Sequence, residues 1–489
     1  MQNAHSILPL AAVLVSLLGP IPIYLSGRTP NVREAWTLLI ALTKFLLVAS
    51  MVPAVLNGVS YTFTIAEVLP GVPIELRVDA MGVSFALVAS FLWILTSIYS
   101  IGYMRSLKEH DQTRYFASFA VAISATIGVA FAGNLLTLYL FYEVLSLSTY
   151  PLVTHEQNLE ARASGRKYLT YILGTSIGLA LPAMLVTYAV AGTLDFRSGG
   201  ILAGVAGPEL MTVLLLLFVF GFAKAGIMPL HAWLPAAMVA PTPVSSFLHG
   251  VAVVKVGVFS ILRVIYHILG PEQLGKFDLG AVITTLAAIT ILVASLIALT
   301  QDNLKRRLAY STVGQLSYMV LGAGMLSASG MLGGTLHIAM HAFGKITLFF
   351  CAGAIYVAHR KKYISQMDGL GRQMPVTYLA FLLGSMSIIG LPPLGGFISK
   401  WHLLLGAVEA GQLALLLVLI VSSLLNAAYF FPIVYRGFFI MPAGEENRGG
   451  IKEAPLLCLV PLSVTALISV ALFFYPDLFI SLINQALAP

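Results

Sequence analysis

Fourteen long apolar segments divide the chain, and they limit its possible folds more than any other feature of the sequence. A helix needs about 20 apolar residues to cross the hydrocarbon core of a bilayer. The segments are continuous apolar runs rather than ten-residue stretches of alternating hydrophobicity, so they predict helices and not membrane strands. The expected spans are roughly 6–26, 35–56, 79–102, 114–132, 134–154, 167–192, 210–237, 241–268, 279–300, 306–327, 331–358, 375–409, 411–437 and 455–485.

The composition also indicates a membrane protein. Only 10% of the 489 residues are charged and 58% are hydrophobic, whereas a soluble domain carries about 25% charged residues. These residues offer too little polar surface for a soluble protein of this size. The sequence therefore predicts an all-α polytopic membrane protein, and it argues against a soluble enzyme, a nucleic-acid binder or a disordered scaffold.

The basic residues are divided unequally between the two sets of alternate loops. Most of the 27 Lys and Arg residues fall in the loops that follow odd-numbered spans, and the other loops hold only Arg77, Arg197 and Lys276. Lys and Arg are enriched in cytoplasmic loops. We therefore expect the first set of loops in the cytoplasm and both termini outside, in the inner (plasma) membrane. The net charge of +7 then says nothing about nucleic acid.

Several ionisable residues lie too deep in the spans to be topology signals. A charge inside a bilayer is expensive, and such residues are usually kept for an ion pathway or a partner. Glu143 is near the midpoint of the fifth span, and Lys224 in the seventh span is its natural partner. The other deep residues are Lys44, His249, Lys255, His337, His341, Lys345 and Lys400. Arg263 lies near a helix end, where we expect it to snorkel to the interface.

The spacing of the histidines suits a proton relay, because imidazole titrates near neutrality. His337, His341 and Lys345 are four residues apart in succession, which places them on one stripe of a helix. His249 and Lys255 are six residues apart, so a bulge or turn is expected between them.

A purely structural role is the competing interpretation. A single polar group in a membrane bundle often serves only to hydrogen-bond one helix to another, and for Lys44 this interpretation is favoured. The histidine pair has the spacing of a zinc site, but no suitable third ligand lies nearby. The two cysteines form no CxxC pair. We therefore expect no metal, no cofactor and no redox chemistry of the chain's own.

Two spans are interrupted by proline and glycine, and each carries a lysine. Pro229 and Pro235 follow Lys224, whereas the interruption at 392–396 precedes Lys400. Broken helices at corresponding positions are typical of repeated transporter folds. The two spans are five apart, an odd number, so we expect two inverted five-helix repeats. The single membrane domain, 1–489, would comprise residues 1–102, the repeats 114–268 and 279–437, and a last helix at 455–485.

Four segments resemble one family. They are KAGIMPLHAWLPAAMVAPTPVSSFLHGVAVVKVGVF (224–259), QDNLKRRLAYSTVGQLSYM (301–319), LHIAMHAFGKITLFFCAGA (336–354) and GLPPLGGFISKW (390–401). They are similar to the proton-translocating antiporter-like subunits of Mrp-type multisubunit Na⁺/H⁺ antiporters, respiratory complex I and membrane-bound hydrogenases. The resemblance covers about residues 79–437.

The resemblance implies roles for most of the deep residues. Glu143 and Lys224 match the family's paired glutamate and lysine. The other matches are His249 and Lys255 in the eighth helix, His341 and Lys345 in the eleventh, and Lys400 in the twelfth. Lysine at this last position is similar to the D-type branch of the Mrp subunits and to some complex I subunits. The resemblance assigns no role to His337 or Lys44.

The implied function is proton translocation, of the cation/proton antiporter type, within a multisubunit complex, most similar to the D-type Mrp subunit. The expected partners are other membrane subunits, protons, Na⁺ as an exchanged cation and the lipid bilayer. PLHAWLPAAMVAPTPVSS is closer to complex I and hydrogenase subunits, so a redox-driven complex is one alternative. A non-transporting structural subunit is another. A stand-alone carrier of an organic substrate would need a polar central cavity, whereas this sequence offers a line of lysines and histidines.

Overall fold

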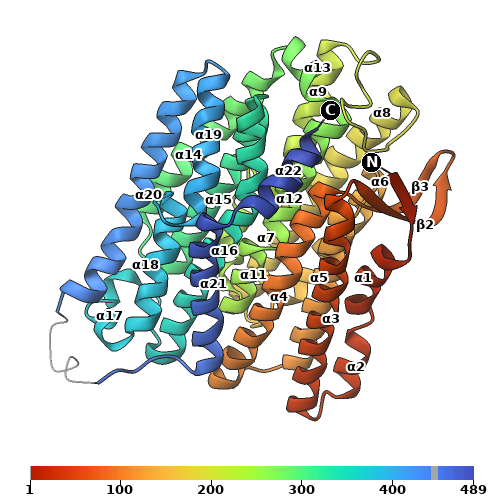
Figure 1. Cartoon of the computed structure of the whole chain (residues 1–489). Helices are drawn as coiled ribbons and strands as arrows, with labels where there is room; N and C mark the ends of the chain where they lie inside the picture. The colour runs from red at the N-terminus through yellow and green to blue at the C-terminus, as the bar shows by residue number, and fades with distance from the viewer. Residues whose placement is uncertain (1, 442–449, 489) are drawn as a thin grey trace.

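The computed structural model describes residues 2–441 and 450–488, which form a bundle of helices with a small sheet at one end (Figure 1). Within these residues, eleven helices are long and apolar enough to cross a membrane. This confirms the prediction of an all-α polytopic membrane protein. The expected domain of residues 1–489 also includes residues 1, 442–449 and 489, which lie outside the described residues.

The helices lie where the spans were expected, but the first, eighth and last spans are each divided into two helices. The first are α1 (Leu8–Leu17), α2 (Pro20–Leu25), α3 (Pro30–Leu56), α4 (Ala80–Leu107), α5 (Gln112–Ala130), α6 (Leu135–Val153), α7 (Leu159–Thr175) and α8 (Leu181–Ala191). The next are α9 (Pro208–Gly221), α10 (Trp233–Ala236), α11 (Thr242–Gly250), α12 (Val253–Arg263), α13 (Pro271–Lys276), α14 (Leu279–Thr300), α15 (Leu304–Gly324) and α16 (Ala328–His359). The last are α17 (Leu370–Gln373), α18 (Pro375–Ile389), α19 (Gly395–Glu409), α20 (Leu413–Phe439), α21 (Leu456–Phe474) and α22 (Asp477–Leu487). The three divided spans consist of α1 and α2, of α11 and α12, and of α21 and α22.

Three expected spans are not among the eleven long apolar helices. One is α15, whose first turn carries Lys305, Arg306 and Arg307. The other two are the spans interrupted by proline and glycine. The seventh span consists of α9, the 3₁₀ turn η2 (Ala223–Ala225) and α10, and the twelfth consists of α18 and α19. The structure therefore confirms both predicted breaks.

A three-stranded sheet lies at the end of the bundle, and the sequence analysis did not predict it. β2 (Val59–Leu69) pairs in parallel with β1 (Gln2–His5) and in antiparallel with β3 (Val72–Val78). The turn between β2 and β3 contains Gly71 at φ +71°, a conformation that glycine adopts without a Cβ clash. Because the hairpin lies between the second and third expected spans, it does not change their number.

Both termini lie at the same end of the bundle as the sheet and α13 (Figure 1). The connection between α2 and α3 lies at the opposite end, together with α17. Two termini at one end agree with an even number of crossings. The assignment of that end to the outside of the cell stays a prediction from the distribution of charge.

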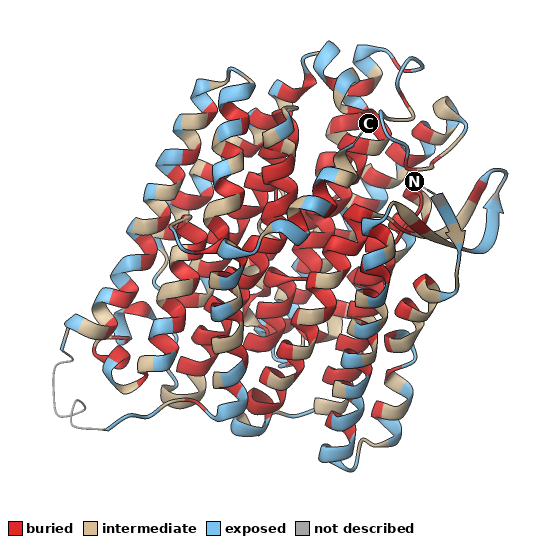
Figure 2. Cartoon of the chain, in the orientation of Figure 1, coloured by how far each residue is buried: buried red, intermediate tan, exposed pale blue. Residues whose placement is uncertain are grey.

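The centre of the bundle is formed by α11, α12 and α16, whose membrane-length windows are fully buried. Figure 2 shows this buried centre surrounded by helices with one exposed side. On α20 the exposed side carries large apolar residues such as Leu413, Leu417 and Leu424. Such a surface is unfavourable in water and favourable against lipid. The arrangement places α11, α12 and α16 away from lipid, and these helices carry most of the deep ionisable residues.

Arg263 does not snorkel to the interface, so that prediction is wrong. It is fully buried at the end of α12. Its Nη1 and Nη2 donate to the two carboxylate oxygens of Asp79 at 2.6 and 2.7 Å. Asp79 also caps α4 by accepting from the backbone N–H of Gly82 at 2.7 Å. A bidentate carboxylate partner satisfies the guanidinium better than a long reach toward water.

Candidate functional site

The structure buries seven of the eight candidate site residues. Lys224, His249, Lys255, His337, His341 and Lys345 are at most 1% exposed, and Lys400 is 6% exposed. Glu143 is the exception, because it lies on a partly exposed side of α6. Buried ionisable groups need polar partners, so the contacts of each one show what the site can do.

The centre of the site is a contact between Lys255 on α12 and His341 on α16. The ammonium Nζ of Lys255 is hydrogen-bonded to Nδ1 of His341. The other ring nitrogen of His341, Nε2, has no hydrogen-bond partner among the described residues. His341 thus offers one nitrogen to the lysine and a second, free nitrogen on the other side of its ring.

His337 continues this contact toward the second broken helix. Its ring centroid lies 5.6 Å from that of His341. Its Nδ1 is 2.8 Å from the hydroxyl of Ser399 on α19, and its Nε2 is 2.9 Å from Oε1 of Gln315 on α15. The two histidines therefore share a stripe of α16, as predicted, and connect it to two neighbouring helices.

Lys345 has separate partners, although it lies one turn beyond His341 on the same helix. Its ammonium donates to the hydroxyl of Ser311 on α15 at 2.8 Å. The hydroxyl of Tyr429 on α20 donates to the same serine oxygen at 3.0 Å. Lys345 therefore forms a side branch, and the predicted stripe does not act as a single row of contacts.

Lys400 stands at the side of the bundle, beside the break between α18 and α19. Its ammonium donates to the carbonyl of Ile389 at 3.1 Å and to the hydroxyl of Ser423 at 3.2 Å. It also lies 4.6 Å from the ring centre of Tyr318, and that ring is 5.9 Å from the ring of His337. A largely apolar cavity of about 290 Å³ adjoins the lysine.

Lys224 lies on the 3₁₀ turn of the first broken helix and bonds to α6. Its ammonium donates to the carbonyl of Tyr142 at 2.6 Å and to the hydroxyl of Ser146 at 2.7 Å. It also lies 3.1 Å from the centre of the Tyr142 ring, as a cation–π contact. The lysine is thus held by neutral groups.

Glu143 and Lys224 are neighbours without forming a contact ion pair among the described residues. Neither carboxylate oxygen of Glu143 has a hydrogen-bond partner there, yet the two charges are near enough to interact electrostatically. The ammonium of Lys224 is instead bonded to the carbonyl of Tyr142 and the hydroxyl of Ser146 on the same helix.

His249 and Lys255 are separated by a helix break, as their spacing predicted. α11 ends at Gly250 and α12 begins at Val253. His249 is fully buried, and neither of its ring nitrogens has a partner in the described part of the chain. The histidine is therefore near the central lysine in sequence, but it is not bonded to it here.

Close packing joins Lys224 to the helix that carries Lys255. A Cβ atom on Gly257 of α12 would lie 2.2 Å from the backbone nitrogen of Ala225 and 2.7 Å from Cβ of Lys224. Only glycine permits this approach. The missing side chain brings the first broken helix directly against α12.

A polar cavity of about 420 Å³ opens at the end of the bundle that holds most of the basic loops. Its wall includes the carboxylates of Glu109, Glu156 and Glu160 and the start of α11 at Thr242. Burial and the nearby charge of Glu156 raise the pKa of Glu109. These carboxylates are not recognisable from the sequence, because they lie in or beside loops where acidic residues are ordinary.

Lys44 on α3 is fully buried, and its ammonium has no hydrogen-bond partner among the described residues. None of the contacts above includes it. The structural interpretation of Lys44 stays a prediction.

Two family models match the chain. The one described as "NADH:quinone oxidoreductase/Mrp antiporter, TM" matches residues 132–426, which is more than half of the sequence. The one described as "NADH-Ubiquinone oxidoreductase (complex I), chain 5 N-terminus" matches residues 70–116. The chain belongs to this family of antiporter-like membrane subunits, as its motifs predicted.

Individual relatives agree with this assignment. Subunit N of NADH-quinone oxidoreductase from Desulforudis audaxviator is 32% identical over 461 residues, which are 90% of each chain. Hydrogenase-4 component B from Escherichia coli is 33% identical over 358 residues, which are 71% of this chain. This chain spans only 52% of that longer relative, and it spans the same share of subunit L from Mycobacterium tuberculosis.

Two solved complexes contain chains of the same fold. The archaeal membrane-bound sulfane sulfur reductase has a chain that superposes with a TM-score of 0.87 at 23% identity, covering 98% of this chain and 97% of that one. The Mrp complex of Dietzia sp. has one with a TM-score of 0.83 at 22% identity and the same coverages. These similarities extend over nearly the whole chain and concern the fold.

Proposed function

We propose that this chain is a proton-translocating subunit of a multisubunit complex in the plasma membrane. The observation that carries the proposal is the buried contact between Lys255 and His341, which continues through His337 and Tyr318 to Lys400. A series of titratable groups and water at membrane depth can pass protons where lipid cannot. The same residues would serve no purpose in a purely apolar core.

The route begins at the polar cavity of the basic end, which we assign to the cytoplasm. α11 leads from this cavity to His249, and a proton from His249 loads Lys255 across the break between α11 and α12. Lys255 passes the proton to Nδ1 of His341. Nε2 of His341, which has no partner among the described residues, releases the proton toward His337 and then Lys400, with Lys345 as a side branch. Release follows on the outer side, where both termini lie.

Glu143 and Lys224 act as the gate of this route. A contact pair between them would stabilise the charged form of Lys224, and its opening removes that support. The neutral partners of Lys224, the Tyr142 carbonyl and the Ser146 hydroxyl, correspond to the open state. Because Lys224 packs directly against α12, a change in its charge acts on the proton held by Lys255.

The energy for net transport comes from partner subunits or from a second ion gradient. Moving one charge against a potential of about 100 mV costs about 2.3 kcal/mol. The solved structures that share this fold support the presence of partners, because both are multisubunit membrane complexes.

Two kinds of complex are candidates for this assembly. We propose an Mrp-type antiporter, in which the chain acts as the D-type subunit and Na⁺ is the exchanged cation, because lysine stands at position 400. The second candidate is a redox-driven complex, and the relative that supports it is subunit N of NADH-quinone oxidoreductase, matched over 90% of both chains. Identifying the copurifying subunits by mass spectrometry distinguishes the two.

We also propose that residues 114–268 and 279–437 are two inverted repeats, flanked by residues 1–102 and 455–485. The support is that each of the two units contains one broken span with a lysine beside the break. In each unit the lysine ammonium donates to a backbone carbonyl, from Tyr142 in the first and from Ile389 in the second.

The first test is the loss of either member of the gate. We expect Glu143→Ala and Lys224→Ala to abolish proton transport by the assembled complex in inverted membrane vesicles while leaving assembly intact. Lys276→Ala is the matched control, because this lysine is exposed and its ion-pair partner among the described residues is Glu272 in its own helix. Near-wild-type pumping by both gate variants would contradict the mechanism.

Lys400→Ala separates transport from a purely structural role. A structural subunit should tolerate this change, because the side chain is at the edge of the bundle. A translocating subunit should lose transport and still copurify with its partners. Full transport by Lys400→Ala would favour the structural alternative.

A further inference from the structure

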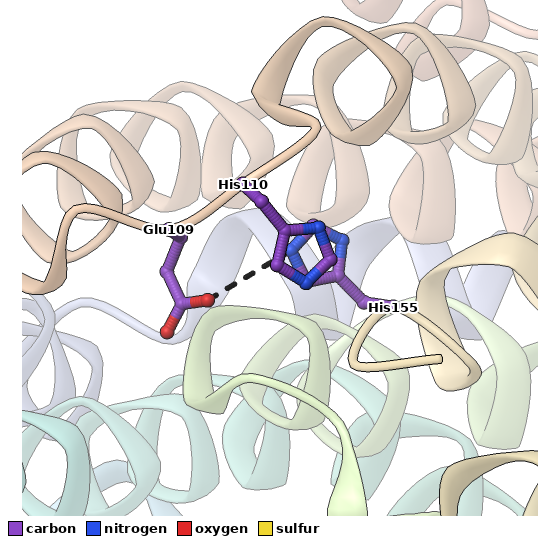
Figure 3. A group of neighbouring side chains, drawn as sticks. All are labelled: Glu109, His110 and His155. Carbon is purple, nitrogen blue, oxygen red and sulfur yellow. Dashed lines mark ion pairs between the residues drawn. The ribbon is translucent and has the colours of Figure 1, made fainter. Parts of the chain in front are cut away.

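Three side chains from two separate loops meet at the basic end of the bundle (Figure 3). Glu109 and His110 lie between α4 and α5, and His155 follows α6. One ligand atom from each residue lies within 4.8 Å of the other two. Figure 3 shows the two imidazole rings stacked and the Glu109 carboxylate beside them.

His155 is the residue that sets this cluster apart from an ordinary polar surface. It is 0% exposed, and neither Nδ1 nor Nε2 has a hydrogen-bond partner in the described parts of the chain. The carboxylate Oε2 of Glu109 is 4.0 Å from its Nε2, beyond hydrogen-bond reach. A buried imidazole with two unpartnered nitrogens calls for a ligand.

His110 supplies a second nitrogen, because a neighbouring carboxylate bonds to the first. Its Nδ1 lies 3.1 Å from Oδ2 of Asp111. A carboxylate that accepts from one imidazole nitrogen leaves the other nitrogen free as a metal ligand, which is a recurrent arrangement at metal sites. Asp111 is also 3.2 Å from Arg114, so this carboxylate stays with the arginine and His110 rather than joining the ligands.

We propose that Glu109, His110 and His155 bind one divalent transition-metal ion, with Zn²⁺ as the best fit. Two imidazoles and one carboxylate are a common zinc ligand set, with a fourth position left for water. Two ligand atoms about 2.0–2.1 Å from a tetrahedral zinc ion lie about 3.4 Å apart. The Glu109–His155 separation of 4.0 Å therefore has to shorten by a few tenths of an ångström.

His110 also has to turn before all three ligands can reach the ion. The rings of His110 and His155 are nearly parallel, at 7° and 4.7 Å between centroids, and parallel rings cannot direct their lone pairs at one point. The side chain of His110 is 47% exposed, so it has room to turn. His155 is enclosed and stays in place.

The proposed metal site borders the polar cavity at the basic end of the bundle. Glu109 is also part of the wall of the 420 Å³ cavity. An ion bound to Glu109 would engage one of the three acidic residues in the wall of that cavity. Metal binding itself does not depend on the proposed proton route, and it is measured separately.

The test is a titration of the purified full-length chain in detergent with Zn²⁺, using a histidine-free purification tag and competition against a chromophoric chelator. We expect one site per chain. His110→Ala and Glu109→Gln should each weaken binding at least tenfold, because each removes one of three ligands. His5→Ala is the matched control, since His5 is exposed on β1 at the other end of the bundle, and it should bind as the wild type does.

Two results would overturn the proposal: no stoichiometric Zn²⁺ binding by the wild-type chain, or unchanged binding by both His110→Ala and Glu109→Gln. His155→Gln adds a check from the buried side, but its folding has to be shown first by gel filtration. The decision therefore rests on the two variants in the loop. Zinc X-ray absorption should show two imidazole ligands in the wild type and one in His110→Ala.

Discussion

The two broken spans hold their lysines in different surroundings. Lys224 in the first is fully enclosed, and it donates to the carbonyl of Tyr142 and the hydroxyl of Ser146 at 2.6 and 2.7 Å. Lys400 in the second makes longer bonds, of 3.1 and 3.2 Å. It borders a cavity and is 6% exposed. Both halves of the molecule place a lysine beside a helix break. The lysine is tightly bonded in the first half and more loosely bonded in the second.

The nearby charges differ as well. Lys224 has a carboxylate neighbour, Glu143, within electrostatic range. Lys400 has no carboxylate partner among the described salt bridges and hydrogen bonds, and its strongest further contact is the ring of Tyr318. The first lysine is built to respond to a neighbouring charge, whereas the second can exchange its proton toward the side of the bundle. This comparison leads to three predictions.

The largest difference is expected from charge reversal at the two lysines. Lys224→Glu should reduce proton transport by at least about a hundredfold, which corresponds to about 2.7 kcal/mol, because it places a carboxylate against the carbonyl of Tyr142 and near Glu143. Lys400→Glu should keep transport within about threefold of the wild type, less than half that energy. Glutamate keeps a titratable group at this position, and the adjoining cavity leaves room for it.

Proton uptake into vesicles, at equal amounts of assembled complex, measures both variants. Equal loss in the two would remove the distinction between a rigid and a loosely held lysine. Equal tolerance would show that the enclosure of Lys224 is unimportant for transport.

The second prediction concerns the glycine beside each lysine. Gly257→Ala drives a Cβ into the backbone of Ala225, and overpacking of this kind costs about 1–3 kcal/mol. Gly390 has φ +89°, and its added Cβ would meet only the flexible Cδ of Lys400, at 2.6 Å. Gly390→Ala should therefore cost about 1–2 kcal/mol from the left-handed backbone, while transport persists.

Thermal unfolding in detergent measures the loss of stability, and vesicle transport measures the loss of function. Together they separate overpacking at position 257 from backbone strain at position 390. Gly390→Asn should be milder than Gly390→Ala, because asparagine tolerates the left-handed conformation. Gly257→Asn should be worse than Gly257→Ala, because the larger side chain meets backbone. The reverse order at either position would contradict the packing explanation.

The smallest effect is expected from the serines that accept from the lysines. Hydrogen bonds to charged groups contribute about 1.5–3 kcal/mol. Ser146→Ala removes one of two close acceptors from an enclosed ammonium, and we expect transport to fall about tenfold. Ser423→Ala removes a 3.2 Å bond from an ammonium that keeps the carbonyl of Ile389 and the ring of Tyr318 as partners, so we expect a change of about twofold or less.

Ser148→Ala is a suitable control for these serine variants. This serine is on the same helix as Ser146, but its hydroxyl bonds only to the backbone carbonyl of Leu145 among the described contacts. If Ser423→Ala impaired transport as strongly as Ser146→Ala, the bond to Lys400 would be as important as its shorter counterpart.

Much of the fold was predictable because it depends on short stretches of sequence. The apolar runs gave the helices, and the prolines and glycines around positions 229 and 392–396 gave the two breaks. The separation of His249 from Lys255 by a turn followed from helical periodicity alone. The hairpin of β2 and β3 escaped prediction, because a loop between two long apolar runs gives little signal of its own.

The residues of the candidate site could be predicted from the sequence, but the contacts between them could be predicted only in part. Depth in the bilayer identified Lys224, Lys255 and Lys400 without any tertiary information. The expected contact between Glu143 and Lys224 is absent from the described ion pairs. Arg263 was expected at the interface and instead bonds to Asp79, 184 residues away in sequence.

The sequence by itself determined which segments cross the membrane, where two of them break and which charges lie at membrane depth, because each property depends on the composition of about 20 consecutive residues against a bilayer of fixed thickness. Only the tertiary structure decided which charges touch. The bond between Lys255 and His341 joins residues 86 apart, and Glu109 meets His155 across two loops. Such contacts depend on which helix faces pack together, and small changes in helix rotation decide whether two side chains meet or turn away.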